Sequence, residues 1–171
     1  MKLCEYTPEY EQVCLSIFDG NTPSFFAVQE RELFAGYLKK VSPPYFYFLV
    51  RDDDETILAC GGVNFDAPNH LAYLRWDMVS RDFQRRGVGT FLVLSRLAII
   101  CQMPDIRTVL LGTSQYSYRF YEKMGFATRR VTQDGITPGL DEYIMGLELN
   151  NEIRNKLDTF GKEKSVSWDV V

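Results

Sequence analysis

Two arginines and two glycines stand close together in the segment QRRGVG, residues 84–89. A strand-like run at residues 70–80 precedes them, and the apolar residues of 89–102 recur with helical spacing directly afterwards. The first turn of a helix leaves backbone N–H groups without partners, and these groups attract anions. Arginine adds positive charge, and glycine lets an anion approach the backbone closely. The segment therefore predicts a phosphate-binding loop at the start of a helix.

The same residues exclude two common nucleotide-binding motifs. A GxxxxGK[ST] loop needs Gly-Lys-Ser/Thr, which does not occur in the chain, and a GxGxxG motif needs a third glycine where Leu92 stands. A solvated turn with two surface arginines is the ordinary alternative. The strand before the segment and the helix immediately after it argue against that alternative. What is left is the pattern Q-x-x-G-x-G.

A second segment, TSQYSYRFYEKMGF, lies at residues 113–126. Taken together and in this order, it and QRRGVG resemble the acyl-CoA-binding motifs of the GNAT superfamily of N-acyltransferases. In that family's second motif a strand leads into a helix with a tyrosine, a charged pair and Gly-Phe. The matching residues are Tyr121, Glu122, Lys123, Met124, Gly125 and Phe126. The resemblance spans residues 1–149, the expected acetyltransferase domain, and leaves 150–171 as a polar extension with room for one short helix.

The resemblance implies acetyl-CoA as the cosubstrate, bound along a strand that splays away from its neighbour. The pyrophosphate is then expected on the loop and the pantetheine arm on the strand and the second motif. The implied binding residues are Asp77, Met78, Val79, Gln84, Arg85, Arg86, Gly87, Val88, Gly89, Thr90, Ser114 and Tyr121.

Two of these positions are expected to take part in the chemistry. The Met78 backbone N–H is expected to polarise the thioester carbonyl, and the Tyr121 hydroxyl to serve the departing thiolate as a general acid. A core aromatic residue is the alternative for Tyr121. The family commonly has an asparagine seven residues before the tyrosine. Ser114 stands there instead, either as a cosubstrate contact or as a helix cap.

The general base is not fixed by the sequence. The alternatives are Asp77, Asp134, Asp141 and Glu142, while an acid in the loop at 134–141 is ordinarily a solvated turn residue. His70 is the only histidine and lies in a turn, so it is interpreted as a surface residue. The acceptor pocket is expected between residues 19–26 and the loop at 134–141. No metal ligands are expected.

Composition narrows the function classes. A chain of 171 residues favours one domain, and a net charge of −4 argues against a nucleic-acid partner. There is no signal peptide and no apolar run long enough to span a membrane, so a cytoplasmic protein is expected. Four cysteines without a CxxC pair are expected to be reduced.

The expected fold is α/β (α+β). The order is strand, two helices, three strands, helix, strand, helix and two strands. A mixed, largely antiparallel sheet of about six to seven strands is expected, flanked by about four helices. The leading function is direct acetyl transfer from acetyl-CoA to a primary amine on a small molecule or peptide. A non-catalytic acyl-CoA sensor and a different acyl group are the alternatives, and a homodimer is possible.

Overall fold

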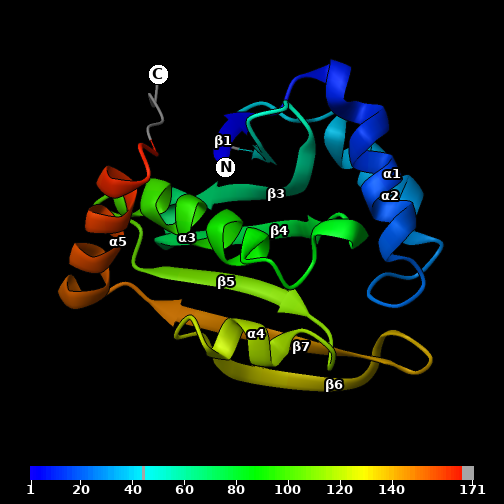
Figure 1. Cartoon of the computed structure of the whole chain (residues 1–171). Coiled ribbons are helices and arrows are strands. Elements are labelled where there is room, and N and C mark those ends of the chain that lie inside the picture. Colours follow the sequence, from blue (N-terminus) through cyan, green and yellow to red (C-terminus); the bar gives the residue numbers. More distant parts are fainter. Residues whose placement is uncertain (44, 167–171) are drawn as a thin grey trace.

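The computed structural model describes residues 1–43 and 45–166. Within them, seven strands form one sheet in the order β1-β2-β3-β4-β5-β7-β6 (Figure 1). The strands are β1 (Lys2–Glu5), β2 (Tyr45–Arg51), β3 (Ile57–Asp66), β4 (Leu71–Val79), β5 (Thr108–Thr113), β6 (Ala127–Thr137) and β7 (Leu140–Glu148). The helices are α1 (Glu11–Asn21), α2 (Glu30–Leu38), α3 (Val88–Cys101), α4 (Tyr118–Glu122) and α5 (Asn151–Glu163). Three short 3-10 turns are η1 (Pro8–Tyr10), η2 (Ala67–Asn69) and η3 (Arg81–Phe83).

This architecture confirms the expected mixed sheet and the expected order of strands and helices. The fifth helix, α5, has 13 residues and lies in the polar C-terminal extension, where the sequence suggested only a short helix. The end of that extension, residues 167–171, lies outside the described residues. None of the helices among the described residues is long and apolar enough to cross a membrane.

The central strands separate where the second motif begins. All neighbouring strands pair antiparallel except β4 and β5, which run parallel. Their pairing covers only Leu71–Tyr73 of β4 and Thr108–Leu110 of β5, although both strands continue. The carboxyl ends of β4 and β5 are therefore splayed, as expected, and leave backbone groups of β4 without a strand partner on that side.

A β-bulge in β4 lies beside this opening. Gly62 pairs with Arg75 and Cys60 with Met78, so Trp76 and Asp77 both stand opposite Gly61. Trp76 has a φ of 54°, which lies in the left-handed region. A bulge bends its strand and redirects side chains, and it is common next to active sites. Here it turns Trp76 and Asp77 toward opposite faces of the sheet.

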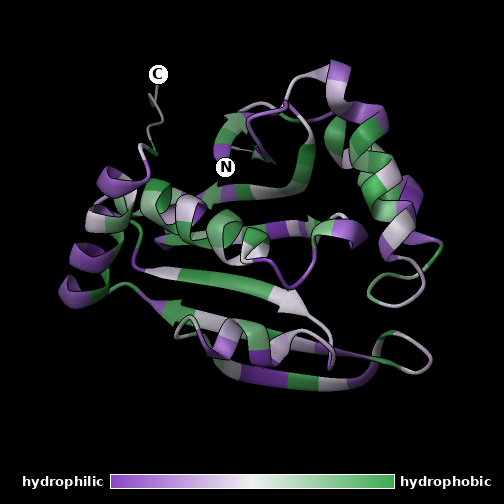
Figure 2. Cartoon of the chain, viewed as in Figure 1, coloured by the Kyte–Doolittle hydropathy of each residue, from purple (hydrophilic) through white to green (hydrophobic). Residues whose placement is uncertain are grey.

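Helices cover both faces of the sheet (Figure 1). On one face, α3 and α4 pack over a core that includes Leu74, Leu97, Val109 and Tyr121. On the other face, α1 and α2 enclose a second cluster of apolar and aromatic side chains. Figure 2 shows β5 as hydrophobic over most of its length and α5 as largely hydrophilic. Val109 and Leu111 of β5 are buried in the core under α3 and α4, whereas Leu110 and Gly112, which point to the other face, are more exposed.

The amphipathic helix α5 packs along α3. Leu157 is buried in the same core cluster as the central strands. Gly161 allows close approach, because a Cβ there would lie 3.3 Å from the Cβ of Ala98. Arg154 donates to the carbonyl of Cys101 at 3.0 Å and also to that of Ile106, which satisfies acceptors beyond the end of α3. The C-terminal extension thus contributes to the core of the chain.

Candidate active site

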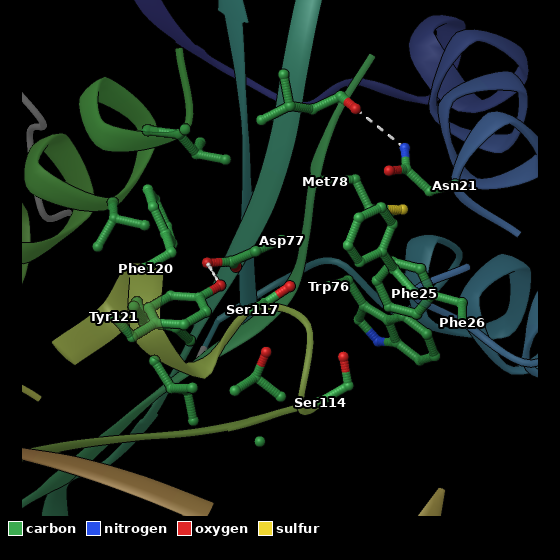
Figure 3. A pocket seen from close by; sticks show the side chains of 18 of the residues that line it. Asn21, Phe25, Phe26, Trp76, Asp77, Met78, Ser114, Ser117, Phe120 and Tyr121 are labelled. Carbon is green, nitrogen blue, oxygen red and sulfur yellow. Dashed lines mark hydrogen bonds between the residues drawn. The ribbon is translucent and has the colours of Figure 1, made fainter. Parts of the chain in front are cut away.

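A cavity of about 970 Å³ opens where β4 and β5 separate. It is lined from both faces of the sheet (Figure 3). Tyr121 and Phe120 of α4 stand on one side, while Phe25, Phe26 and Trp76 gather on the other. Its size is at the upper end of the range for small-molecule sites in proteins. The splay of β4 and β5 therefore produces a continuous passage between the two faces.

Most of the sequence-predicted site residues line this cavity. They are Asp77, Met78, Val79, Gln84, Arg85, Gly87, Gly89, Thr90, Ser114 and Tyr121. Two others do not line it: Val88, the first residue of α3, is buried, and Arg86 is exposed with its guanidinium 5.7 Å from the centre of the Phe83 ring. Ten of the twelve residues predicted to bind acetyl-CoA therefore line one cavity.

The loop before α3 is shaped for an anion. Gly87 is the N-cap residue with a φ of 81°, and no side chain caps this end of the helix. The N–H groups of the first turn are therefore open to a ligand, and the helix dipole favours negative charge there. Gly89 packs closely against its neighbours, because a Cβ there would lie 3.3 Å from Phe120 and 3.4 Å from Val79. Arg85 borders the same cavity and supplies positive charge.

Gln84 is turned inward rather than toward the loop's open side. Its side-chain amide donates to the Asn21 side chain at 3.0 Å and to the Val79 carbonyl at 3.3 Å. Asn21, at the end of α1, also donates to the Val79 carbonyl at 3.0 Å (Figure 3). These hydrogen bonds connect the end of β4 to α1 and to the loop. The Gln84 side chain therefore stabilises the structure around the cavity.

The register of β4 bears on the expected role of Met78. The Ser80 N–H donates to the Leu58 carbonyl of β3 at 2.8 Å, and Met78 pairs with Cys60 two residues away. Backbone groups alternate in direction along an antiparallel strand. The Met78 N–H accordingly faces β3, and the backbone groups of Val79 face the opening. The register favours Val79 over Met78 as the donor to a thioester carbonyl.

An ion pair lies beneath the Tyr121 hydroxyl. Arg96 of α3 is fully buried and donates to both carboxylate oxygens of Asp77 at 2.6 Å. The Tyr121 hydroxyl lies 3.1 Å from Asp77 Oδ2 (Figure 3). A carboxylate paired with arginine accepts hydrogen bonds, so the phenol is the donor. Arg96 also donates to the Gly62 carbonyl at 2.9 Å and to the Leu92 carbonyl at 3.1 Å.

This environment keeps Tyr121 protonated. Burial raises the pKa of the Tyr121 phenol well above its usual value of 10, and the negative charge of Asp77 raises it further. Both carboxylate oxygens of Asp77 accept hydrogen bonds from Arg96, and Oδ2 also accepts one from Tyr121. Asp77 therefore holds Arg96 and Tyr121 in place, and it also lines the cavity.

The other suggested bases fall into two groups. Glu142 lines the cavity, with Arg130 3.5 Å from its carboxylate. Asp134 and Asp141 hold the turn between β6 and β7, because they accept hydrogen bonds from the Gly139 and Asp134 N–H groups. His70 lies at the start of β4, exposed, with Nδ1 2.9 Å from the Asp105 carbonyl oxygen. His70 does not line the cavity, which begins on β4 at Leu74.

Sequence reasoning missed two charged residues of this region. Arg96 is the one charged residue in the apolar stretch of α3, which was a usable signal, because a buried charge needs a partner. Glu30 lines the cavity and accepts from the Ala27 N–H at 2.7 Å at the start of α2. Burial raises the pKa of Glu30, and the Ala27 N–H opposes that shift. Nothing in the local sequence distinguishes Glu30 from the exposed Glu32.

The model of the acetyltransferase (GNAT) family matches residues 11–126. This chain belongs to the GNAT acetyltransferases. They are enzymes of N-acetyl transfer, and the family uses acetyl-CoA. None of the curated proteins matches the chain by sequence.

Solved structures of GNAT acetyltransferases share the fold. One, assigned to the GNAT family of Desulfovibrio desulfuricans, has a TM-score of 0.73 at 18% identity, covering 86% of this chain and 98% of the other. The ribosomal-protein-S18-alanine N-acetyltransferase of Escherichia coli has a TM-score of 0.71 at 16% identity, with coverages of 87% and 94%. An aminoglycoside 6'-N-acetyltransferase in complex with coenzyme A has a TM-score of 0.69 at 15% identity, with coverages of 86% and 97%.

Proposed function

We propose that this GNAT acetyltransferase moves an acetyl group from acetyl-CoA directly to a primary amine. The observation that carries the proposal is the position of the Tyr121 hydroxyl. It lies on an ion pair at the edge of a cavity that both faces of the sheet line. The loop before α3 supports binding of a diphosphate at one end of this cavity. Aromatic side chains and carboxylates at the other end support an amine acceptor.

The residues of the loop and of β4 would hold the cosubstrate. Acetyl-CoA supplies the acetyl group as a thioester. The open N–H groups at the start of α3 and the guanidinium of Arg85 bind the pyrophosphate. The Val79 N–H, which faces the opening, donates to the thioester carbonyl oxygen as negative charge develops there. Removing one donor of this kind typically costs about 3–4 kcal/mol of transition-state stabilisation.

Tyr121 donates a hydrogen bond to the sulfur of CoA as it leaves. The amine nitrogen forms a bond to the acetyl carbon, the carbon–sulfur bond breaks, and the amine loses one proton. The phenol turns about its C–O bond from Asp77 to the sulfur and stabilises the thiolate with a hydrogen bond. A thiol has a pKa of about 8.5, so the thiolate leaves without removing the phenol proton. The proton lost by the amine restores the thiol.

Replacing Tyr121 with phenylalanine tests this role. We expect Tyr121→Phe to lower kcat about 100-fold, a typical cost of removing one hydrogen-bond donor to developing negative charge, with the KM for acetyl-CoA within about twofold. Tyr118→Phe is the matched control. It lies on the same helix, and its ring stacks on Tyr143 at 4.5 Å. It should leave kcat unchanged. An unchanged kcat in Tyr121→Phe would show that the hydroxyl is not needed.

Three narrower expectations stay predictions. They are the choice of the acetyl group over larger acyl groups, a cytoplasmic location and a homodimer. Reaction rates with acetyl-CoA and propionyl-CoA address the first. The role of the residues at 150–171 as a separate extension also stays a prediction, although α5 packs on α3.

A further inference from the structure

The cavity has two chemically different ends. Beyond β4, toward α1 and α2, its lining changes from the polar loop to aromatic side chains (Figure 3). Phe25, Phe26 and Trp76 form this wall, and Tyr37 lies behind them with its hydroxyl 2.7 Å from the Asn64 side-chain oxygen. An acceptor that meets the thioester from the face opposite α4 must pass along this wall.

The aromatic wall is rigid. The Trp76 ring stacks on Phe26 with centroids 6.0 Å apart and contacts Phe34 at 5.2 Å. Phe18 supports Phe26 from below at 5.2 Å. Rings held in this way offer a flat, apolar surface that loses little entropy when a ligand binds. The faces of such rings also attract a cation.

Negative charge borders the same end of the cavity. Glu30 and Glu142 line it together with the guanidinium groups of Arg75 and Arg85, and Arg130 lies 3.5 Å from the Glu142 carboxylate. The Arg75 guanidinium lies over the Tyr73 ring at 5.1 Å. Glu30 is half-buried and has no basic partner among the described residues. A half-buried carboxylate with a free oxygen beside aromatic rings is suited to an ammonium group.

A second hollow, of about 720 Å³, adjoins the aromatic end. It shares Phe25, Arg85 and Tyr116 with the main cavity. Its other lining residues, within 23–29 and 137–140, include no acidic side chain. This hollow extends the apolar surface outward from Phe25, between the α1–α2 connection and the turn between β6 and β7.

We propose that the acceptor is a primary amine carried on an aromatic or other apolar group, with no carboxylate next to the nitrogen. It binds as an ammonium at Glu30 and releases one proton to solvent, so that the neutral amine attacks the thioester, and its body lies against Phe25, Phe26 and Trp76. This inference rests on the proposed acetyl transfer. A polyamine would need carboxylates at intervals along the wall, whereas the wall is aromatic. An amino acid would bring a third carboxylate beside Glu30 and Glu142.

Matched acceptors test the class. With acetyl-CoA, we expect 2-phenylethylamine to have a kcat/KM at least about tenfold above that of ethylamine, which lacks the ring. The kcat/KM for 2-phenylethylamine should also be at least about tenfold above that for phenylalanine, which adds a carboxylate. Spermidine should be poorer than 2-phenylethylamine. A preference for phenylalanine or spermidine would overturn the inference and leave the proposed acetyl transfer in place.

Two variants locate the ammonium. Glu30→Gln keeps an oxygen for the Ala27 N–H but removes the charge, so the KM for 2-phenylethylamine should rise about tenfold or more. The KM for acetyl-CoA should not change. Glu32→Gln, an exposed position on the same helix, is the control and should leave both constants unchanged. Equal effects of the two variants would overturn the assignment of Glu30. Acetyl-CoA binding without transfer to any amine would instead contradict the proposed function.

Discussion

The hydroxyl of Tyr121 owes its position to an ion pair that connects helix α3 to strand β4 of the sheet. Arg96 of α3 is fully buried, and the side chain of Asp77 on β4 is 14% exposed. Neither charge is well solvated, so each depends on the other. Tyr121 was predictable from its motif. The Arg96–Asp77 pair was not, because it joins residues 19 positions apart and depends on the side of β4 that Asp77 faces.

Removing the cation should destabilise the protein strongly. We expect Arg96→Met to lower the free energy of unfolding by about 3–5 kcal/mol, because Asp77 is left as an unpaired, largely buried charge. Urea denaturation measures this quantity. Arg129→Met is the control: Arg129 pairs with Glu148 at the surface, and that change should cost less than about 1 kcal/mol. Similar decreases in the free energy of unfolding for both variants would show that the buried ion pair contributes no more to stability than the surface pair.

At the scale of the elements, β3 and β4 together shape the site. The bulge in β4 sends Asp77 toward α3, and Gly61 of β3 leaves space for the ion pair. On the other side of β3, Gly62 leaves space for the Tyr37 hydroxyl, because a Cβ there would lie 2.5 Å from its oxygen. Adjacent glycines in a strand interior signal close approach by other atoms. The sequence showed this signal, but only the register reveals which atoms approach.

Filling the space at Gly61 should disturb the site. A Cβ at Gly61 would lie 2.6 Å from Arg96 Nη1 and 3.0 Å from Asp77 Oδ1. We expect Gly61→Ala to destabilise the protein by about 1–3 kcal/mol, as overpacking does, and to lower kcat. Gly36→Ala in α2 meets no atom within 4 Å and should stabilise the protein by about 0.5–1 kcal/mol. Thermal unfolding and steady-state kinetics distinguish the two. Gly61→Ala with full stability and turnover would show that the ion pair tolerates displacement.

At the scale of the whole molecule, the sheet separates two helical layers, and the splay of β4 and β5 joins them through one cavity. The order of strands and helices was predictable, because hydrophobic periodicity and Gly or Pro breaks mark each element. The contribution of α5 was not. Its sequence is polar on average, and the apolar residues that face α3 form a narrow stripe. The acceptor end was also hidden, because residues from α1, α2 and β4 meet there only in three dimensions.

The packing of α5 leads to a stability prediction. Leu157→Ala should lower the free energy of unfolding by about 2–5 kcal/mol, as expected for a buried leucine, in a single transition. The KM for acetyl-CoA should not change, because α5 lines no part of the cavity. The neighbouring Lys156→Ala changes an exposed side chain and should stay within about 0.5 kcal/mol. A separate, early transition for α5 would instead show that it folds as an independent extension.

The most direct test of the central claim is amine-dependent release of the CoA thiol by the purified protein. Acetyl-CoA is mixed with 2-phenylethylamine, and free thiol and N-acetylated amine are measured together, the second by mass spectrometry. We expect the two products to form in equal amounts and both rates to fall about 100-fold in Tyr121→Phe. Tight binding of acetyl-CoA with no acetylated product from this amine or from ethylamine, phenylalanine and spermidine would contradict it.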